Sequence, residues 1–245
     1  MKKEELLKKI TTPINDPAFP ETKVSYINRE FVCFRYKTDG DALKKILPEP
    51  LKPRGNQVKF EFIKMPDATG RGSYTEACQI IPCTFKGKMG EFTLAMYVDN
   101  FPSIASGRET AAFPKKLGKP RVYIDGTETL AATLDYGSLR VAQGTMGYRY
   151  QPMDLMTAED ELTQPNYRLN IMRDYDGSPR IVELTESMIT NLNVKDAWTS
   201  PARLQLFEHV HAPVADLPVR EMVGGSDIIA DLTLPQPKKI YDYLS

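Results

Sequence analysis

The chain has 245 residues, which is enough for one large domain or two small ones at about 150 residues per domain. Its composition is that of an ordinary globular protein, and its 32 basic residues balance 32 acidic residues. A net charge of zero argues against a nucleic-acid-binding protein, which usually has a basic excess. No apolar stretch approaches the roughly 18 residues of a membrane-spanning helix, and the first residues lead into no signal-peptide core. We therefore expect a cytoplasmic protein with no nucleic-acid or membrane partner.

The N-terminal part of the chain predicts two short helices. In the first ten residues, three aliphatic side chains stand among charges, a pattern typical of a short amphipathic helix. Three prolines exclude regular structure over residues 11–20, which we expect to form an extended arm. A second helix is predicted at residues 41–46, with Thr38 or Asp39 as its cap and two prolines beyond its end.

Most of the remaining sequence alternates with period two, which predicts strands. Residues 58–62 alternate apolar with charged side chains, and another strand follows the turn signal at residues 176–179. The strand at residues 92–98 would present four apolar residues on one face: Phe92, Leu94, Met96 and Val98. A further helix is expected around residues 201–209. Many short strands between glycine and proline turns indicate one mainly β domain over residues 1–245, with an antiparallel sheet rolled into a barrel or a sandwich.

Common catalytic and cofactor motifs are absent from the sequence. There is no nucleophile elbow, phosphate-binding loop, zinc-protease motif or dinucleotide fingerprint. Cys33, Cys78 and Cys83 have no CxxC spacing, so neither a disulfide framework nor a zinc site is indicated. His209 and His211 could share a strand face, but no third ligand supports a metal site, and we interpret them as surface or interface residues. We expect no metal and no cofactor.

Lys115 and Lys116 differ from the other lysine pairs of the chain because small and apolar residues flank them. Burying two lysines is costly, so this setting favours a functional use over an ordinary solvated pair.

Two more charged residues stand on apolar strand faces. On a strand expected at residues 23–35, Arg29 shares a face with Ile27 and Phe31, and on residues 74–80 Glu76 lies among apolar neighbours. We expect Arg29 and Glu76 to pair inside the sheet, either as a functional pair or as a bridge that fixes strand register. Glu61, between Phe60 and Phe62 in the sequence, fits a solvent-facing position as well as a site role.

The run at residues 107–118 resembles the active-site segment of the acetoacetate decarboxylase family. The resemblance depends on Gly107-Arg108-Glu109 and on Phe113-Pro114-Lys115-Lys116-Leu117-Gly118. Shorter matches occur in the same order over essentially the whole chain: Pro17-Ala18-Phe19-Pro20, Asn28-Arg29-Glu30, Tyr74-Thr75-Glu76, Leu134-Asp135-Tyr136-Gly137, Asp176-Gly177-Ser178-Pro179-Arg180 and Arg203-Leu204-Gln205-Leu206-Phe207. Two positions depart from the family pattern: Phe113, where tyrosine is common, and Ile27, where an aromatic residue is common.

The resemblance implies a cone-like antiparallel β-barrel with an N-terminal arm and peripheral helices. It also implies a large homo-oligomer, for instance a dodecamer, which needs no cofactor. The implied reaction converts acetoacetate, a small β-keto acid, to acetone and carbon dioxide through a Schiff base on Lys115. The implied functional neighbours of that lysine are Lys116, Arg29, Glu76 and Glu61. We expect the substrate pocket to be lined by Phe113, Ile27, Met96 and Tyr97.

Schiff-base formation requires a neutral amine, which is a minor form of an ordinary lysine, whose pKa is about 10.4. Two ammonium groups about 7 Å apart repel by only about 2.4 kcal/mol at an effective dielectric constant of about 20. We therefore expect desolvation by Phe113 and Met96 to matter more than the charge of Lys116, which an extended chain would point away from Lys115.

The other charged residues have expected roles in the same reaction. Arg29 would orient the substrate carboxylate, Glu76 would hold Arg29, and Glu61 is a candidate for proton transfer.

Two other functions stay open. One is a different Schiff-base enzyme of the same fold, an aldolase or dehydratase for longer keto acids, although Arg29 and Glu76 argue against it. The other is a non-enzymatic barrel that binds a small ligand.

Overall fold

A computed structural model describes residues 1–20 and 24–245 of the chain. Its helices and strands are α1 (Lys3–Leu6), β1 (Ser25–Lys37), α2 (Gly40–Ile46), β2 (Lys52–Pro53), β3 (Gln57–Ala68), β4 (Gly72–Phe85), β5 (Lys88–Val98), α3 (Phe101–Ala111), β6 (Lys115–Leu117), β7 (Lys119–Asp125), β8 (Thr129–Tyr136), β9 (Leu139–Gly147), β10 (Gln151–Pro152), α4 (Leu155–Leu162), β11 (Asn166–Arg173), β12 (Pro179–Ser187), β13 (Thr190–Ser200), β14 (Ala202–Leu206), the 3-10 helix η1 (Val214–Asp216), β15 (Glu221–Thr233) and β16 (Lys238–Asp242). Strands dominate, so the prediction of a mainly β protein is confirmed. In this part of the chain no helix reaches the length and apolarity needed to cross a bilayer.

The strands form two sheets. The larger has twelve strands, with the order β10-β13-β15-β1-β3-β4-β5-β11-β12-β16, and β2 and β6 pair with β4 and β5 beside this path. The smaller sheet has four strands, in the order β14-β9-β8-β7. Most neighbours are antiparallel, as predicted, but β6 and β11 both run parallel to β5.

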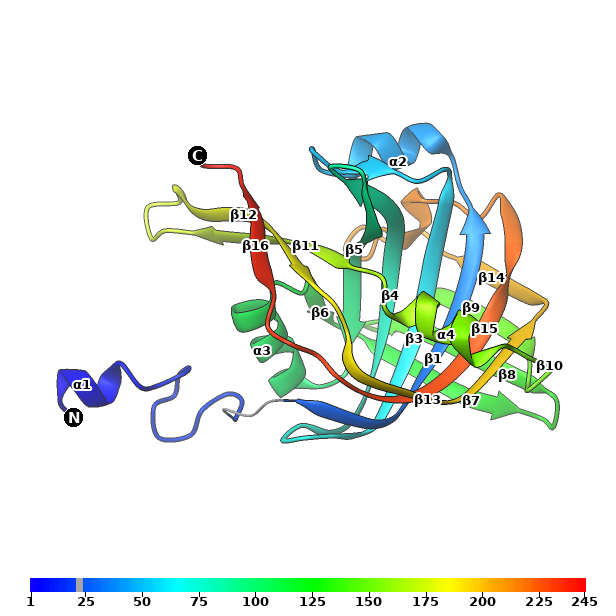
Figure 1. The fold of residues 1–245 in the computed structure, drawn as a ribbon, viewed down its shortest axis with the longest axis horizontal. Coiled ribbons are helices and arrows are strands. Elements are labelled where there is room, and N and C mark those ends of the chain that lie inside the picture. The colour runs from blue at the N-terminus through cyan, green and yellow to red at the C-terminus, as the bar shows by residue number, and fades with distance from the viewer. Residues whose placement is uncertain (21–23) are drawn as a thin grey trace.

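The larger sheet curls but stays open in its hydrogen bonding. Among the described residues no pairing joins its terminal strands β10 and β16, and Figure 1 shows β11, β12 and β16 extending away from the curled strands β1, β3 and β4. The closed barrel therefore remains a prediction, while the antiparallel curled sheet is observed.

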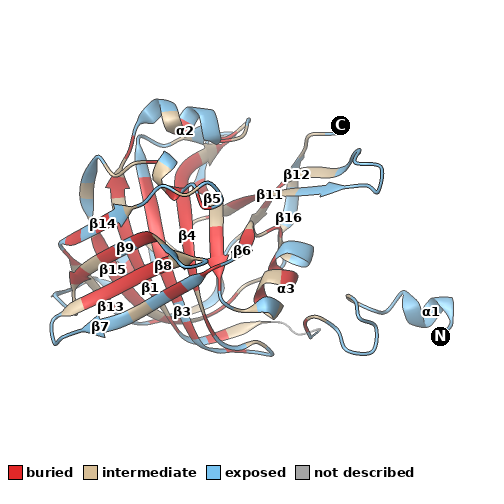
Figure 2. Cartoon of the chain, turned by 180° about the vertical axis from the view of Figure 1, so that it is seen from behind, coloured by how far each residue is buried: buried red, intermediate tan, exposed pale blue. Residues whose placement is uncertain are grey.

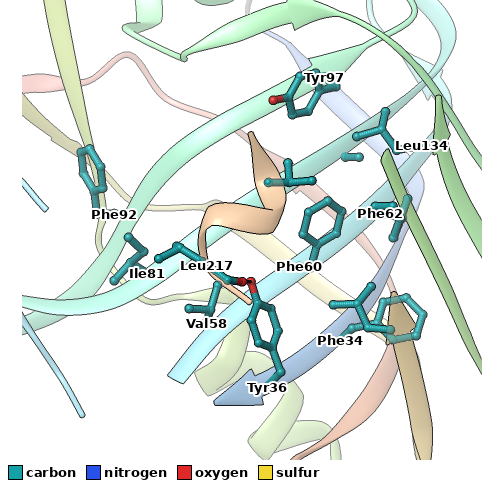
Figure 3. Close-up of a cluster of buried hydrophobic side chains, with 14 of the residues drawn as sticks. Phe34, Tyr36, Val58, Phe60, Phe62, Ile81, Phe92, Tyr97, Leu134 and Leu217 are labelled. Atoms are coloured by element: carbon teal, nitrogen blue, oxygen red, sulfur yellow. Dashed lines mark hydrogen bonds between the residues drawn. The ribbon is translucent and has the colours of Figure 1, made fainter. Parts of the chain in front are cut away.

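Both faces of the larger sheet are apolar, which explains why its central strands are buried (Figure 2). One face packs against the smaller sheet, where Phe34, Phe60 and Phe62 form a cluster whose ring centroids lie 5.3 to 6.0 Å apart (Figure 3). In the same cluster the Tyr36 hydroxyl donates to the carbonyl of Leu217 at 3.0 Å and ties η1 to the sheet. The second apolar face lies on the opposite side of the strands, and this is the face that holds the candidate site.

The two helices predicted near the N-terminus are confirmed. They are α1 and α2, and Asp39 takes the cap position of α2, although its side chain accepts no capping hydrogen bond. Residues 11–20 contain no helix or strand, as predicted for an arm. The strand expected from residue 23 begins at Ser25 in the structure, and Lys23 itself lies outside the described residues.

The helix expected at residues 201–209 is wrong, because residues 202–206 form β14 and the rest of the segment is irregular. Ala202 and Leu204 are buried while Arg203 and Gln205 are exposed, a period of two that a strand requires and a helix does not.

The shared face predicted for residues 92–98 is also wrong. The pairing of β4 with β5 skips one residue, so that Gln79 faces Ala95 but Ile80 faces Thr93. This bulge shifts the alternation. Phe92 joins the core against the smaller sheet, and Met96 and Val98 join the opposite face.

Gly144 on β9 tests the packing of the two sheets, because a Cβ there would lie 2.5 Å from the Phe34 ring. We expect Gly144→Ala to lower the free energy of unfolding by about 1–3 kcal/mol through overpacking. A thermal melt should show a loss of roughly 2–4 °C per kcal/mol. Gly40→Ala is the matched control, because Gly40 opens α2 with no atom near its Cβ position. Equal melting of Gly144→Ala and the wild type would contradict this packing.

Candidate active site

Helix α3 leads into strand β6, which places Lys115 on the second face of the larger sheet. The Asn100 side chain caps α3 by accepting a hydrogen bond from the Ser103 backbone N–H at 2.9 Å, and Pro102 fits the first turn. The helix ends at Ala112, whose left-handed φ of 57° reverses the chain. Strand β6 then runs parallel to β5, with Lys115 opposite Met96. The lysine side chain therefore enters the space between α3 and β4.

The Lys115 amine is buried between two oxygen atoms that accept its hydrogen bonds. Its Nζ donates a short hydrogen bond to Glu76 Oε1 and a second one to Ser103 Oγ at 2.8 Å. Ser103 Oγ lies 3.4 Å from the same Glu76 oxygen, so the three groups form one network. All three residues are buried, with Lys115 only 6% exposed. A buried lysine in such a network can exchange its proton without contact with bulk water.

Arg29 and Glu76 are in contact, as the sequence predicted. Arg29 Nη2 lies 3.9 Å from Glu76 Oε2, on the side of the carboxylate away from Lys115. The guanidinium also lies over the rings of Tyr26 and Phe31, at 4.8 and 4.7 Å from their centroids. Its Nε and Nη1 are buried without a hydrogen-bond partner in the protein. Glu76 thus contacts two cations, Lys115 and Arg29. The Nε and Nη1 atoms of Arg29 are available to donate hydrogen bonds to a ligand.

Apolar walls surround the amine. Lys115 Nζ lies 5.3 Å from the Phe113 ring centroid and 5.9 Å from that of Tyr74. Burial raises the pKa of the Tyr74 hydroxyl well above its ordinary value, and the neighbouring Glu76 carboxylate adds to this effect. Phe113 and Lys115 both face the cavity, as the extended geometry predicted.

Gly107 on α3 makes room for the lysine stem. A Cβ at this position would lie 2.7 Å from Lys115 Cδ and 2.9 Å from its Cε. Only glycine lets the helix approach the lysine this closely, which gives a steric reason for the Gly107-Arg108-Glu109 sequence. Arg108 adds a hydrogen bond of 3.1 Å to the Lys115 carbonyl and fixes the backbone of β6.

Lys116 points away from this cavity, as predicted from the alternation of side chains. It pairs with Tyr97 in the β5–β6 ladder, and its Nζ donates to the carbonyl of His211 at 2.5 Å. Its ammonium lies 5.1 Å from the Tyr136 ring centroid, on the opposite side of β6 from Lys115.

Glu61 lies in an adjoining cavity, which we call the Arg168 cavity. Arg29, Met96 and Phe113 line both this cavity and the one that holds Lys115, which we call the Lys115 cavity. Glu61 is buried and faces the same side as Lys59 and Ile63, which excludes the solvent-facing alternative. The structure does not bring Glu61 to the wall of the Lys115 cavity.

The Glu61 carboxylate is held by Lys59 Nζ at 2.9 Å, and the same amine donates to Glu91. Burial alone would lower the pKa of Lys59, but the carboxylates of Glu61 and Glu91 raise it well above its ordinary value. Burial raises the pKa of Glu91 despite its contact with Lys59.

Two predicted lining residues lie elsewhere. Ile27 is 42% exposed, because a bulge at Asn28, with φ of 53°, interrupts the alternation of β1 and turns Tyr26 towards the cavity instead. Tyr97 is buried against the smaller sheet, 6.0 Å from the Tyr136 ring, because it follows Met96 on the opposite face of β5. In the structure, therefore, neither Ile27 nor Tyr97 lines the Lys115 cavity or the Arg168 cavity, whereas Phe113 and Met96 line both.

Sequence reasoning gave no site role to Ser103, Gly107, Tyr26 and Arg168, although Gly107 was part of the family motif. The signal for the first two was present, because Asn100-Phe101-Pro102 is a typical start of a helix that leads directly to them. Tyr26 required knowledge of the bulge, and no local pattern marked Arg168.

The histidine pair shows no metal-binding arrangement. In the parts of the chain that the structure covers, no group of three or more His, Cys, Asp or Glu side chains could hold a metal ion. His209 Nδ1 instead accepts a hydrogen bond from the His211 backbone N–H at 3.0 Å.

Taken together, the cavity presents a nucleophilic amine, a carboxylate that can take its proton, and a guanidinium that can hold an anion. These are the groups required to join an amine to a ketone that carries a carboxylate.

Comparison with known proteins agrees with the chemistry that the site suggests. The family model of acetoacetate decarboxylase (ADC) matches residues 11–244. The chain is 52% identical over 245 residues to an acetoacetate decarboxylase of Clostridium botulinum, covering 100% of this chain and 99% of that one. A solved structure of acetoacetate decarboxylase is 50% identical, with a TM-score of 0.98 and 100% of both chains covered. The enzyme from Legionella pneumophila is 40% identical, with a TM-score of 0.92 over 97% of this chain and 95% of that one. The chain therefore belongs to the acetoacetate decarboxylase family.

Proposed function

We propose that this protein decarboxylates acetoacetate to acetone and carbon dioxide through an imine on Lys115. The observation that carries the proposal is the buried Lys115 amine, which contacts Glu76 and Ser103 beside a guanidinium with free donors. Family membership supports the same activity.

Glu76, in hydrogen-bond contact with the Lys115 nitrogen, first takes a proton from its ammonium group and leaves a neutral amine. The neutral nitrogen attacks the ketone carbon, and a proton moves from the nitrogen to the former ketone oxygen to give the carbinolamine. Glu76 then returns its proton to the carbinolamine hydroxyl, which leaves as water, and a protonated imine remains. Ser103 donates to the departing oxygen or holds the nitrogen, because its hydroxyl reaches both Lys115 and Glu76.

The second step breaks the bond between the carboxylate and its neighbouring carbon. The electron pair moves into the protonated imine and gives an enamine, while carbon dioxide leaves. A proton then adds to the enamine carbon, and water releases acetone from Lys115. The net reaction consumes one proton for each acetoacetate anion.

Arg29 is proposed to orient the substrate carboxylate through its unpartnered Nε and Nη1. Its contact with Glu76 limits the positive charge that it offers. That limit helps catalysis, because a carboxylate bound too strongly in the ground state is harder to lose.

Lys116 and Glu61 receive smaller proposed roles. Lys116 anchors β6 to the carbonyl of His211. Glu61 supplies protons by relay from the Arg168 cavity, because it does not line the Lys115 cavity.

We also propose that the curled larger sheet acts as the cone-like barrel of the family and that the protein works without a cofactor as a large cytoplasmic homo-oligomer. The arm over residues 1–20 projects from the body in Figure 1, although Thr11 donates a hydrogen bond to Glu109 and Phe19 is buried, and it is the proposed contact with another copy. Sedimentation of the full chain and of a chain shortened by this arm tests the assembly.

The direct test of the activity is release of carbon dioxide from acetoacetate, measured beside its longer homologues. Acetone and carbon dioxide from acetoacetate support the proposal. Carbon–carbon bond formation or loss of water from longer keto acids, without decarboxylation, would identify the alternative Schiff-base enzyme.

Borohydride trapping identifies the nucleophile. After incubation with acetoacetate and reduction, we expect peptide mapping to find the adduct on Lys115, because its amine lines the cavity and that of Lys116 does not. Lys116 on the same peptide is the internal control. An adduct on Lys116 alone would overturn the assignment, and no adduct on either lysine would overturn the imine mechanism.

Glu76→Gln removes the base and leaves an amide of the same shape. We expect kcat to fall by at least about 100-fold, the lower range for general base catalysis, while the protein stays folded. Glu159→Gln, a change on the exposed surface of α4, is the control. Turnover near the wild-type value in a folded Glu76→Gln protein would reduce Glu76 to a structural role.

A further inference from the structure

Arg168 on β11 is a buried cation with no anionic partner. It is 1% exposed, and its guanidinium stacks on the Phe113 ring at 4.0 Å from the centroid. Its Nη2 donates to the hydroxyl of Ser187, but its Nε is buried without a hydrogen-bond partner. Among the residues that the structure describes, no carboxylate forms an ion pair with it, and burial lowers its pKa to about 9.

The carboxylates nearby are engaged with other cations. Three of them line the Arg168 cavity: Glu61, Glu91 and Glu161. Lys59 holds the first two at 2.9 Å, and Arg35 forms a close ion pair with the third. These acidic residues therefore form their ion pairs with Lys59 and Arg35 and not with Arg168.

A second guanidinium faces the same cavity. Arg29 also lines it and has two donors, Nε and Nη1, without partners. Neutral hydrogen-bonding groups, among them Gln164, Asn166 and Ser187, complete the polar part of the wall. The cavity thus offers two under-partnered guanidinium groups, and it shares Arg29, Met96 and Phe113 with the Lys115 cavity.

Burying an uncompensated cation is costly, and an anion that enters the cavity would remove that cost. Guanidinium groups match the planar geometry of a carboxylate, which accepts two parallel hydrogen bonds from one arginine.

We infer that the Arg168 cavity is a carboxylate-binding subsite beside the Lys115 cavity, and that Arg168 is its main anchor. The ligand class is a small organic monocarboxylate. Two sources share this chemistry: the carboxylate of the keto acid before its ketone reaches Lys115, and a separate organic acid. The first source rests on the proposed function, whereas the subsite itself does not.

Butyrate is the test probe, because it has a carboxylate but no ketone and so forms no imine. We expect butyrate to raise the melting temperature of the wild-type protein with saturation, beyond the effect of sodium chloride at equal ionic strength. In Arg168→Gln the butyrate dissociation constant should rise at least tenfold. Arg173→Gln is the matched control, since Arg173 ends the same strand and is exposed, and its binding should equal that of the wild type.

The KM for acetoacetate separates the two sources of carboxylate. A several-fold higher KM in Arg168→Gln, with kcat within about twofold of the wild type, identifies the substrate carboxylate as the occupant. An unchanged KM with lost butyrate binding identifies a separate acid, and both results support the subsite. Absence of carbon dioxide release by the wild type would overturn the proposed function but leave the butyrate result standing.

Two results would overturn the subsite. One is wild-type melting that responds to butyrate no more than to chloride. The other is butyrate binding by Arg168→Gln within twofold of the wild-type value. If Arg168→Gln does not fold, hydrogen exchange of wild-type β11 decides, because bound butyrate should slow it and failure to do so rejects the proposal.

Discussion

The buried contact between Lys115 and Glu76 is the interaction on which the site depends. Removing one partner of such a pair leaves an uncompensated charge, typically at a cost of about 3–5 kcal/mol, so the fold has to bring both together. It does so with elements that are distant in sequence, since Glu76 belongs to β4 and Lys115 to β6. The third member, Ser103, comes from the helix between β5 and β6. Helix α3, which Asn100 caps and after which Ala112 reverses the chain direction, brings Ser103 and Lys115 to Glu76.

Side chains that point alternately to the two faces of the larger sheet form the walls of the site. In β3, Phe60 and Phe62 face the smaller sheet, while Lys59 and Glu61 face the opposite side. The same sheet therefore supplies an apolar core on one face and buried charges on the other. The charges are tolerated because most of them are paired. The guanidinium groups of Arg29, Arg71 and Arg168 each have a buried nitrogen without a hydrogen-bond partner, and they line cavities that can hold a ligand.

Phe113 lines both the Lys115 cavity and the Arg168 cavity. Its ring lies 5.3 Å from the Lys115 amine and 4.0 Å from the Arg168 guanidinium. An aromatic face can stabilise a cation on either side without donating a proton to it. This explains how one side chain can exclude water from the amine and also form the wall of an anion-binding space.

The sequence predicted the parts of the fold and site that depend on local patterns. The period of two in β1 and β4 was sufficient to foresee that Arg29 and Glu76 meet, and the extended step after Pro114 separated Lys115 from Lys116. Two positions escaped these patterns for identifiable reasons. The bulge at Asn28 turned Ile27 outwards, and a second bulge in β5 moved Phe92 to the other face.

The partners of Arg168 could not be predicted at all. Its guanidinium stacks on the ring of Phe113, so the contact joins β11 to the segment that precedes β6. Such contacts are set by the tertiary arrangement of strands and leave no trace in the local alternation.

A crystal structure of the borohydride-reduced acetoacetate adduct would test the central claim most directly. The account predicts a secondary amine on Lys115 whose nitrogen stays within hydrogen-bond distance of Glu76 and Ser103, with the added carbon chain towards Phe113 and Met96. An adduct nitrogen that has moved away from both Glu76 and Ser103 would contradict the claim that their network holds the reacting amine.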